Sequence, residues 1–265
     1  MERLKKPLGL HAKMKNWLFF FVCLIYLFPQ VILDEQLEVF KEEELMQLFK
    51  DEKFVIVLLS KNENCIEKCQ TLENNLLSIR EDLVEDTGGW VVRSYSPSYF
   101  KELELKDSTI LFMREQRPLI YSGDSQNAEN LLSYFLSNKI SAVHNLTDDD
   151  FEHKTQAGTG ATTGDWLVMF IRKNSEDYSH HFYIAEQVSV NLKGRMNVGI
   201  VEKEFGPVTS RRFGVKYFPS YILFRLGKLY RYGFDVKDGD LLTAFAKDTY
   251  RNAKAEVVPP PKSPL

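Results

Sequence analysis

Two uninterrupted apolar segments, Phe54–Leu59 and Trp166–Ile171, lie 112 residues apart in the chain. Six apolar positions in a row predict a strand that is covered on both faces. The tripeptide Ile-Leu-Phe occurs at 110–112 and again at 222–224, with the same spacing. The chain is therefore predicted to contain an internal repeat.

The pattern around each apolar segment predicts one order of elements, βαβαβαββα, in both halves. In the first half, strands are expected at 37–40, 54–60, 90–95, 109–114 and 118–121, and helices at 42–50, 65–84, near 99 and at 127–137. In the second half, strands are expected near 143 and at 166–172, 197–202, 220–224 and 228–232, and helices from 148, at 178–192, at 207–213 and from 238 to about 251. Each half should place helices against a central mixed sheet.

The most specific local pattern lies between 211 and 232. Phe213-Gly214-Val215 precedes Pro219, which is followed by an apolar β run and a Gly-Lys turn. Proline is tolerated at the first residue of a strand, and the bond from Phe218 is a candidate for the cis form. This arrangement resembles the second half of a thioredoxin fold.

The resemblance extends over residues 35–252 and is to the protein disulfide isomerase family in its broad sense, which includes redox-inactive domains. It implies an α/β protein of two tandem thioredoxin-like domains, each a central mixed β-sheet flanked by helices. The domains are expected at 34–140 and 141–254, after a leader at 1–33 and before a Pro-rich extended tail at 255–265. A length of 265 residues suits two such units.

The N-terminus has the pattern of a secretory signal peptide: five Lys or Arg residues precede an apolar run from Trp17 to Phe28. That run is shorter than the roughly 20 residues of a spanning helix. Because no small-residue cleavage site follows, an uncleaved anchor, with the rest of the chain lumenal, is the alternative. Loss of 1–33, with five Lys or Arg and one Glu, would change the formal net charge from -3 to -7. An acidic mature chain argues against nucleic acid as a partner.

Beyond Cys23 in the leader, the chain has two cysteines, Cys65 and Cys69. In the resembled family, a Cys-x-x-Cys pair begins the helix after the first core strand, where the helix dipole favours thiolate. Here the spacing is Cys-x-x-x-Cys, and Asn62 or Asn64 is expected to cap the helix. Cα atoms at this helical spacing are about 6 Å apart, within disulfide range. Cys65 and Cys69 are therefore the candidate catalytic residues.

Three departures from the family pattern weaken the catalytic interpretation. Asn64 replaces the usual tryptophan, and the wholly apolar preceding strand offers no buried carboxylate beneath the cysteines. The repeat places Asp107 where the second half has Pro219, so the substrate-docking proline is absent. Little or no redox activity is expected, although thiol–disulfide oxidoreductase activity remains an alternative.

The second half has no cysteine, and the repeat places Asp177 and His181 opposite Cys65 and Cys69. An i, i+4 Asp/His pair at a helix start is expected to be solvated, and no metal or cofactor is predicted. The resemblance implies that the backbone of Phe218, before Pro219, lies open beside the helix start that carries Tyr178.

These three residues, Phe218, Pro219 and Tyr178, are the candidate substrate-binding site, where an extended polypeptide would pair by β-addition. Tyr217 and Tyr221 would add apolar contact.

Asn145-Leu146-Thr147 is a glycosylation sequon, expected at a loop or helix start. The favoured function is binding of client or partner polypeptides in the secretory pathway, with the endoplasmic reticulum lumen implied by the resemblance. Secretion and membrane anchoring remain open, as does a role as scaffold subunit of a membrane assembly. Membrane contact is expected only if the leader is uncleaved. The sequence leaves the clients, the oligomeric state and the bonding of the cysteines open.

Overall fold

The computed structural model describes residues 36–123, 127–160, 163–234, 236 and 239–261. The predicted leader at 1–33 lies outside these residues. Within the described ranges, no helix combines the length and the apolar character that crossing a membrane requires.

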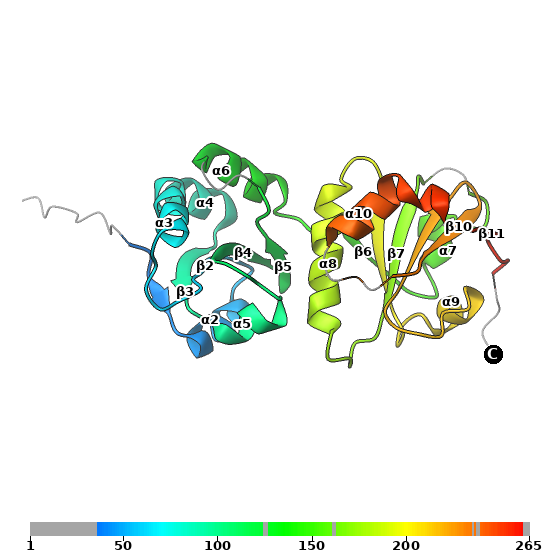
Figure 1. The fold of residues 1–265 in the computed structure, drawn as a ribbon, viewed down its shortest axis with the longest axis horizontal. Coiled ribbons are helices and arrows are strands. Elements are labelled where there is room, and N and C mark those ends of the chain that lie inside the picture. The colour runs from blue at the N-terminus through cyan, green and yellow to red at the C-terminus, as the bar shows by residue number, and fades with distance from the viewer. Residues whose placement is uncertain (1–35, 124–126, 161–162, 235, 237–238, 262–265) are drawn as a thin grey trace, which may run out of the picture. The chain divides into compact units, whose positions relative to one another are not determined.

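The first domain is built on a five-stranded mixed sheet in the order β1-β3-β2-β4-β5 (Figure 1). Its strands are β1 (Val39–Phe40), β2 (Phe54–Leu59), β3 (Trp90–Ser94), β4 (Thr109–Arg114) and β5 (Arg117–Ile120). Its helices are α2 (Glu42–Asp51), α3 (Lys68–Ser78), α4 (Arg80–Thr87), α5 (Pro97–Glu102) and α6 (Ala128–Ser137).

The second domain has a six-stranded mixed sheet in the order β11-β10-β9-β7-β8-β6. Its strands are β6 (Val143–Leu146), β7 (Trp166–Ile171), β8 (Asn197–Glu202), β9 (Ser220–Arg225), β10 (Lys228–Tyr232) and β11 (Ala255–Val257). Its helices are α7 (Phe151–Thr155), α8 (Tyr178–Asn191), α9 (Pro207–Arg212), α10 (Gly239–Lys247) and the 3₁₀ helix η1 (Thr249–Asn252). The predicted α/β class and the repeated element order are confirmed.

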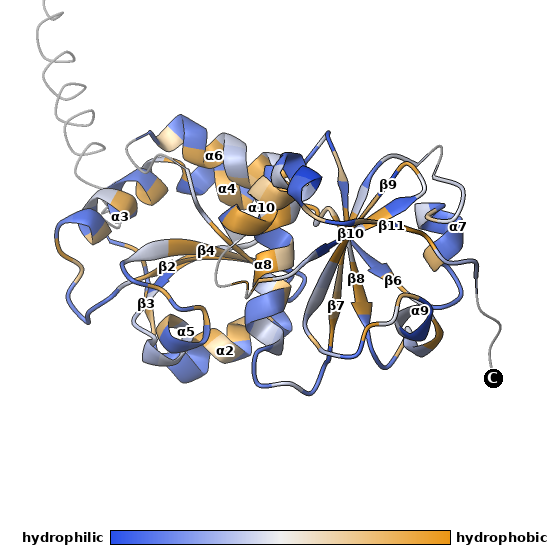
Figure 2. Cartoon of the chain, turned by 45° about the vertical axis from the view of Figure 1, so that its right-hand side comes forward, coloured by the Kyte–Doolittle hydropathy of each residue, from blue (hydrophilic) through white to orange (hydrophobic). Residues whose placement is uncertain are grey.

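The apolar segments are central strands with both faces buried, as predicted. In β2, Ile56 and Leu58 face the core beneath α3, α4 and α6, whereas Val55 and Val57 face the core beneath α2 and α5. Successive side chains in a strand point to opposite faces, so a strand between two helical layers is apolar at every position. Figure 2 shows this as orange strands in both sheets.

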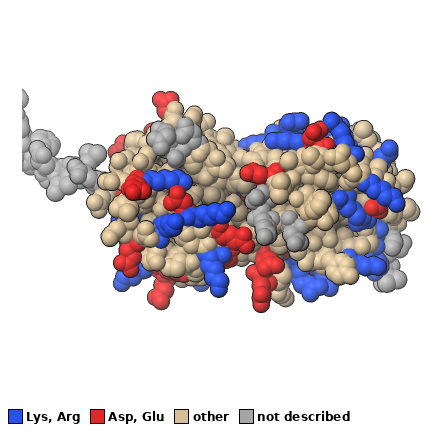
Figure 3. Space-filling model, viewed as in Figure 1, with Lys and Arg blue, Asp and Glu red and all other residues tan. Residues whose placement is uncertain are grey.

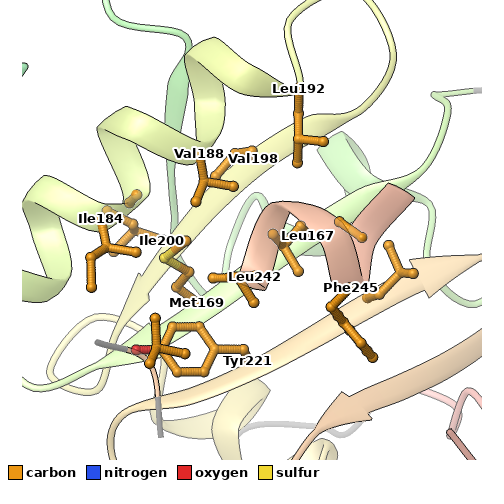
Figure 4. Packing of buried hydrophobic residues seen from close by; sticks show 14 of the residues in the cluster. Leu167, Met169, Ile184, Val188, Leu192, Val198, Ile200, Tyr221, Leu242 and Phe245 are labelled. Carbon is orange, nitrogen blue, oxygen red and sulfur yellow. The ribbon is translucent and has the colours of Figure 1, made fainter. Parts of the chain in front are cut away.

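The second domain is layered in the same way. Alternate residues of β7 pack under α8 and α10, where Leu167 and Met169 meet Val188, Leu242 and Phe245 (Figure 4). The remaining β7 side chains pack under α7 and α9. Each sheet therefore has a core on both faces.

The two sheets differ by two residues in strand register. Val57 of β2 pairs with Leu111 of β4. Met169, 112 residues after Val57, pairs with Tyr221 rather than with Leu223. The single offset of 112 residues therefore cannot superimpose both strand pairs. A shift of two leaves every side chain on its original face, so the hydrophobic pattern is preserved and does not reveal it.

The single helix predicted at 65–84 is wrong in two respects. It begins only at Lys68, and it breaks at Ile79, whose backbone (φ -115°, ψ 8°) separates α3 from α4. The Ile79 side chain is buried in the core, so the chain bends where that packing draws it inward. Gly88 then ends α4 in the left-handed conformation, as glycine does at many helix ends.

The predicted Pro-rich tail at 255–265 begins as part of the sheet. Ala255–Val257 forms β11, which pairs antiparallel with β10. Val258 is buried, and the Arg212 Nε–H donates a hydrogen bond to the Pro259 carbonyl. The segment is extended, as expected from its composition, but it forms the edge strand of the second sheet rather than a free tail.

The two domains meet where α8 lies against β5 (Figure 1). Glu186 of α8 is fully buried and pairs with Arg114 at 2.6 Å and Arg117 at 3.0 Å, both from the first sheet. The Gln187 Nε2–H donates to Ser122 Oγ at 2.8 Å. The residues from Gln36 onward therefore form one compact unit.

Candidate functional site

The cysteine site lies between β2 and α3. Cys65 and Cys69 form a disulfide with a Cα–Cα distance of 5.1 Å. Cys69, in the first turn of α3, is only 3% exposed, whereas Cys65 is partly exposed. One sulfur is thus accessible and its partner is covered.

The expected cap of this helix is wrong. The N-cap of α3 is Glu67, with no side-chain cap hydrogen bond, so neither Asn62 nor Asn64 caps it. Cys65 stands before the helix in irregular backbone. Because the field of the helix dipole falls off within the first turn, α3 supports a thiolate at Cys65 less than the prediction assumed.

A cavity of about 480 Å³ opens beside Cys69, and Asp107 and Ser108 line it. Asp107 pairs with Lys68 at 3.5 Å across this cavity. No proline is found at any of the five positions 105–109. The docking proline is therefore missing from this site whichever strand register is used to align the domains.

Sequence reasoning missed a buried carboxylate close to the cysteines. Glu73 of α3 is 6% exposed and, together with Cys65 and Arg93, lines a small cavity of about 270 Å³. Its Oε1 accepts a hydrogen bond from the Leu37 N–H and lies 3.5 Å from Arg93 Nε. The strand before the cysteines has no carboxylate, as expected, and Glu73 comes instead from the helix that follows them. The i, i+4 spacing from Cys69 was the available signal.

A larger cavity, of about 720 Å³, opens beside Pro219 of the second domain. Its walls come from α5 and the turn after it, from the start of α8, from the first residues of β9 and from the segment after β10. We refer to it as the Pro219 cavity. The Phe218–Pro219 peptide bond is cis, as the sequence suggested.

The residues opposite the cysteines in the repeat, Asp177 and His181, both line the Pro219 cavity. His181 is 7% exposed, and its Nδ1 forms a 2.9 Å hydrogen bond with the Tyr221 hydroxyl. Burial, together with the nearby His180, lowers the pKa of His181, while Asp177 acts in the opposite direction. His181 therefore provides a neutral, buried floor rather than a solvated pair.

Most of the aromatic side chains predicted to line the groove make other contacts. The Phe218 ring packs on the α7/α9 core and lies under Arg172 at 5.7 Å. The Tyr178 hydroxyl donates to Glu202 at 2.8 Å, and burial raises its pKa above the usual range. Tyr221 is in the core, whereas Tyr217 is 81% exposed. The structure thus brings Pro219 to the cavity without the side chains of Phe218 or Tyr178.

Asn145 lies on strand β6, not in a loop or helix start, which corrects the expectation for the sequon. The residue is exposed, and its Oδ1 accepts a 3.3 Å hydrogen bond from Arg117 Nη2.

Charged groups form no metal centre in the described residues, where no cluster of three or more His, Cys, Asp or Glu side chains has suitable geometry. On the face drawn in Figure 3, acidic and basic side chains are interspersed.

No family model matches the sequence. A thioredoxin domain-containing protein of Theileria parva is 34% identical over 118 residues, which are 44% of this chain and 54% of that protein. The chain thus spans about half the length of this curated relative. Among solved structures, full-length ERdj5 is 16% identical with a TM-score of 0.39, covering 88% of this chain and 31% of its own. Zinc-bound human ERp44 is 10% identical with a TM-score of 0.39, covering 80% and 57%.

The two mixed sheets, their flanking helices and the match to a thioredoxin domain-containing protein agree with each other. The described residues therefore form two tandem thioredoxin-like α/β domains.

Proposed function

We propose that this chain is a secretory-pathway member of the protein disulfide isomerase family that binds client or partner polypeptides with little or no redox activity. The observation that carries the proposal is the Pro219 cavity, which opens beside the cis proline of the domain without cysteine.

The backbone beside the cavity supports binding of an extended chain. Pairing between β7 and β9 ends at Phe170 and Ser220. Within the described part of the chain, the N–H and C=O of Phe218 form no backbone hydrogen bond. Unpaired backbone groups next to a strand are the feature that β-addition uses, while pockets for side chains provide specificity. The cavity volume is also within the range of roughly 300–1,000 Å³ of ligand pockets.

The proposed location rests on two features. The N-terminal pattern of basic residues followed by a short apolar run is typical of secretory leaders. The Cys65–Cys69 disulfide suits an oxidising compartment. Tracking a tagged full-length chain through cell fractions, with sequencing of its mature N-terminus, tests both the location and the fate of the leader.

Binding is tested with the full chain and a fluorescent, cysteine-free unfolded polypeptide, by anisotropy. Tyr217→Ala removes an exposed ring next to Phe218 and should weaken binding about 10-fold, because exposed aromatics dominate many interfaces. Leu226→Ala removes a side chain that is 73% exposed at the opposite end of β9 and should have no effect. Equal loss in both variants, or in neither, would contradict a site beside Pro219.

Disulfide exchange is the second candidate function, favoured by the contrast between a partly exposed Cys65 and a covered Cys69. It is tested by measuring the reduction potential of the pair by alkylation and mass spectrometry across a glutathione series. A midpoint near the reticulum value of about -180 to -210 mV would support an oxidoreductase. A bridge that glutathione never opens, or a pair that stays reduced throughout, would leave polypeptide binding as the function.

A further inference from the structure

The Pro219 cavity is built by both domains. Lys101, Glu102 and Glu104 of the first domain line it together with Glu176 and Asp177 of the second. We propose that it selects basic polypeptide segments, in which a Lys or Arg side chain of an extended client enters between the two domains. This inference rests on the proposed function and specifies its substrate class.

The charge of the cavity wall is the first argument. Four carboxylates, those of Glu102, Glu104, Glu176 and Asp177, face a single ammonium group, that of Lys101. In the described ranges, no Lys, Arg or His nitrogen lies within ion-pair distance of these four carboxylates. The carboxylates outnumber the ammonium group, and an excess of one sign of charge in a cleft with low-dielectric walls concentrates ions of the opposite sign.

Two of these acidic residues lie at helix ends, but neither stabilises the end of its helix. Glu102 is the last residue of α5, where a negative side chain opposes the helix dipole. Asp177 is the N-cap of α8, yet its side chain forms no cap hydrogen bond. Neither carboxylate is therefore used to satisfy the end of its own helix.

The remaining wall suits the stem and head of a long cationic side chain. Phe234 is 78% exposed, and its ring centroid lies 5.7 Å from that of Tyr232. Aromatic faces attract Lys and Arg head groups and pack against their methylene stems. On the floor, His181 is held by Tyr221, and its lowered pKa keeps the imidazole neutral near pH 7. A neutral floor does not repel a cation.

The contact between the domains fixes the two acidic walls opposite each other. Glu186, at the middle of the same helix that begins after Asp177, is paired with Arg114 and Arg117 of the first sheet. Glu102 and Glu104 belong to that first domain. The acidic walls are thus preorganised, which lowers the cost of binding.

The test uses the full chain with Cys65→Ala and Cys69→Ala, so that mixed disulfides do not contribute. Anisotropy is measured with three labelled peptides of equal length, in which one apolar framework carries Lys, Gln or Glu at the same positions. The Lys peptide should bind at least about 10-fold more tightly than the Gln peptide, and raising salt from about 0.05 M to 0.5 M should reduce this difference.

The Glu102→Gln/Glu104→Gln variant should lose most of the preference for the Lys peptide and keep its affinity for the Gln peptide. Glu85→Gln/Asp86→Asn makes the same change of charge on exposed positions of α4, outside the cavity, and should keep the preference. Glu102→Lys/Glu104→Lys should shift the preference toward the Glu peptide. Thermal unfolding verifies that each variant is folded.

Each outcome is decisive. Equal binding of the Lys and Gln peptides, or loss of the preference in the α4 variant as well, overturns selection by the cavity while polypeptide binding stands. Absence of binding for all three peptides overturns the proposed function together with this inference.

Discussion

At the scale of single residues, the second domain has a histidine where the repeat places a cysteine of the first domain. His181 lies at the position that the repeat assigns to Cys69, and both are buried at the start of a helix. The hydrogen bond between the Tyr221 hydroxyl and His181 Nδ1 ties α8 to β9. An imidazole in this place cannot exchange disulfides.

His181 should make the stability of the protein depend on pH. Because its pKa is lowered in the folded state, the unfolded chain binds the proton first as pH falls through about 6.5. The free energy of unfolding should therefore be greatest above that pH and decline below it. NMR titration of the ring and urea unfolding at about pH 7.5 and 5.5 measure both effects.

Burial and the nearby Lys154 also lower the pKa of His144, so this residue too should make the free energy of unfolding decline in acid. His181→Gln should remove part of the decline in acid. A ring of His181 that titrates above 6.5 would contradict this account.

At the scale of elements, strand β11 completes the second sheet. It covers the edge of β10, and Glu256 pairs there with Arg231 at 2.9 Å. An uncovered strand edge exposes backbone groups that favour aggregation. The Pro residues that follow have no backbone N–H to donate, so the strand cannot continue through them.

Ending the chain after Lys254 should destabilise the second domain by about 2 kcal/mol or more. It removes the pairing with β10 and the buried Val258 side chain. Urea unfolding followed by the fluorescence of Trp166 measures this change. Ending the chain after Pro261 is the control and should have no effect, because β11 and Val258 remain. Equal stability of both truncated forms would show that β11 contributes nothing.

At the scale of the whole described unit, the buried Arg114–Glu186–Arg117 group couples the domains. The Arg114 side chain is 2% exposed, and burial lowers its pKa while Glu186 raises it. Removing one partner of a buried ion pair leaves an uncompensated charge. Loss of this group should destabilise both domains, because its charged residues come from both.

Glu186→Ala should therefore reduce the free energy of unfolding by about 3–5 kcal/mol. The two domains should also unfold in separate transitions. Trp90 reports the unfolding of the first sheet and Trp166 that of the second, each measured in a variant that keeps only that one of the two tryptophans. Asp248→Ala breaks the exposed pair with Arg251 and should have little effect. Coincident transitions in the Glu186 variant would show that other contacts couple the domains.

Local patterns were sufficient for the fold class and the repeat, and they made the Phe218–Pro219 bond a candidate for the cis form. Each depends on residues close in sequence: the all-apolar strands Phe54–Leu59 and Trp166–Ile171, and the aromatic-Pro step before β9. Strand periodicity and proline geometry act over a few residues, so sequence alone determines them.

Only the tertiary structure decided which distant residues meet. The burial of Glu186, the placement of Glu73 beside Cys65 and the shared wall of Glu102 and Asp177 join segments that no local pattern relates. The sequence pattern also did not reveal the shift of two residues in strand register. This shift changes which residues pair across the strands, but each side chain stays on the same face of the sheet. Charges and carboxylates acquire their roles from packing across the chain, whereas strands and turns acquire theirs from their neighbours in sequence.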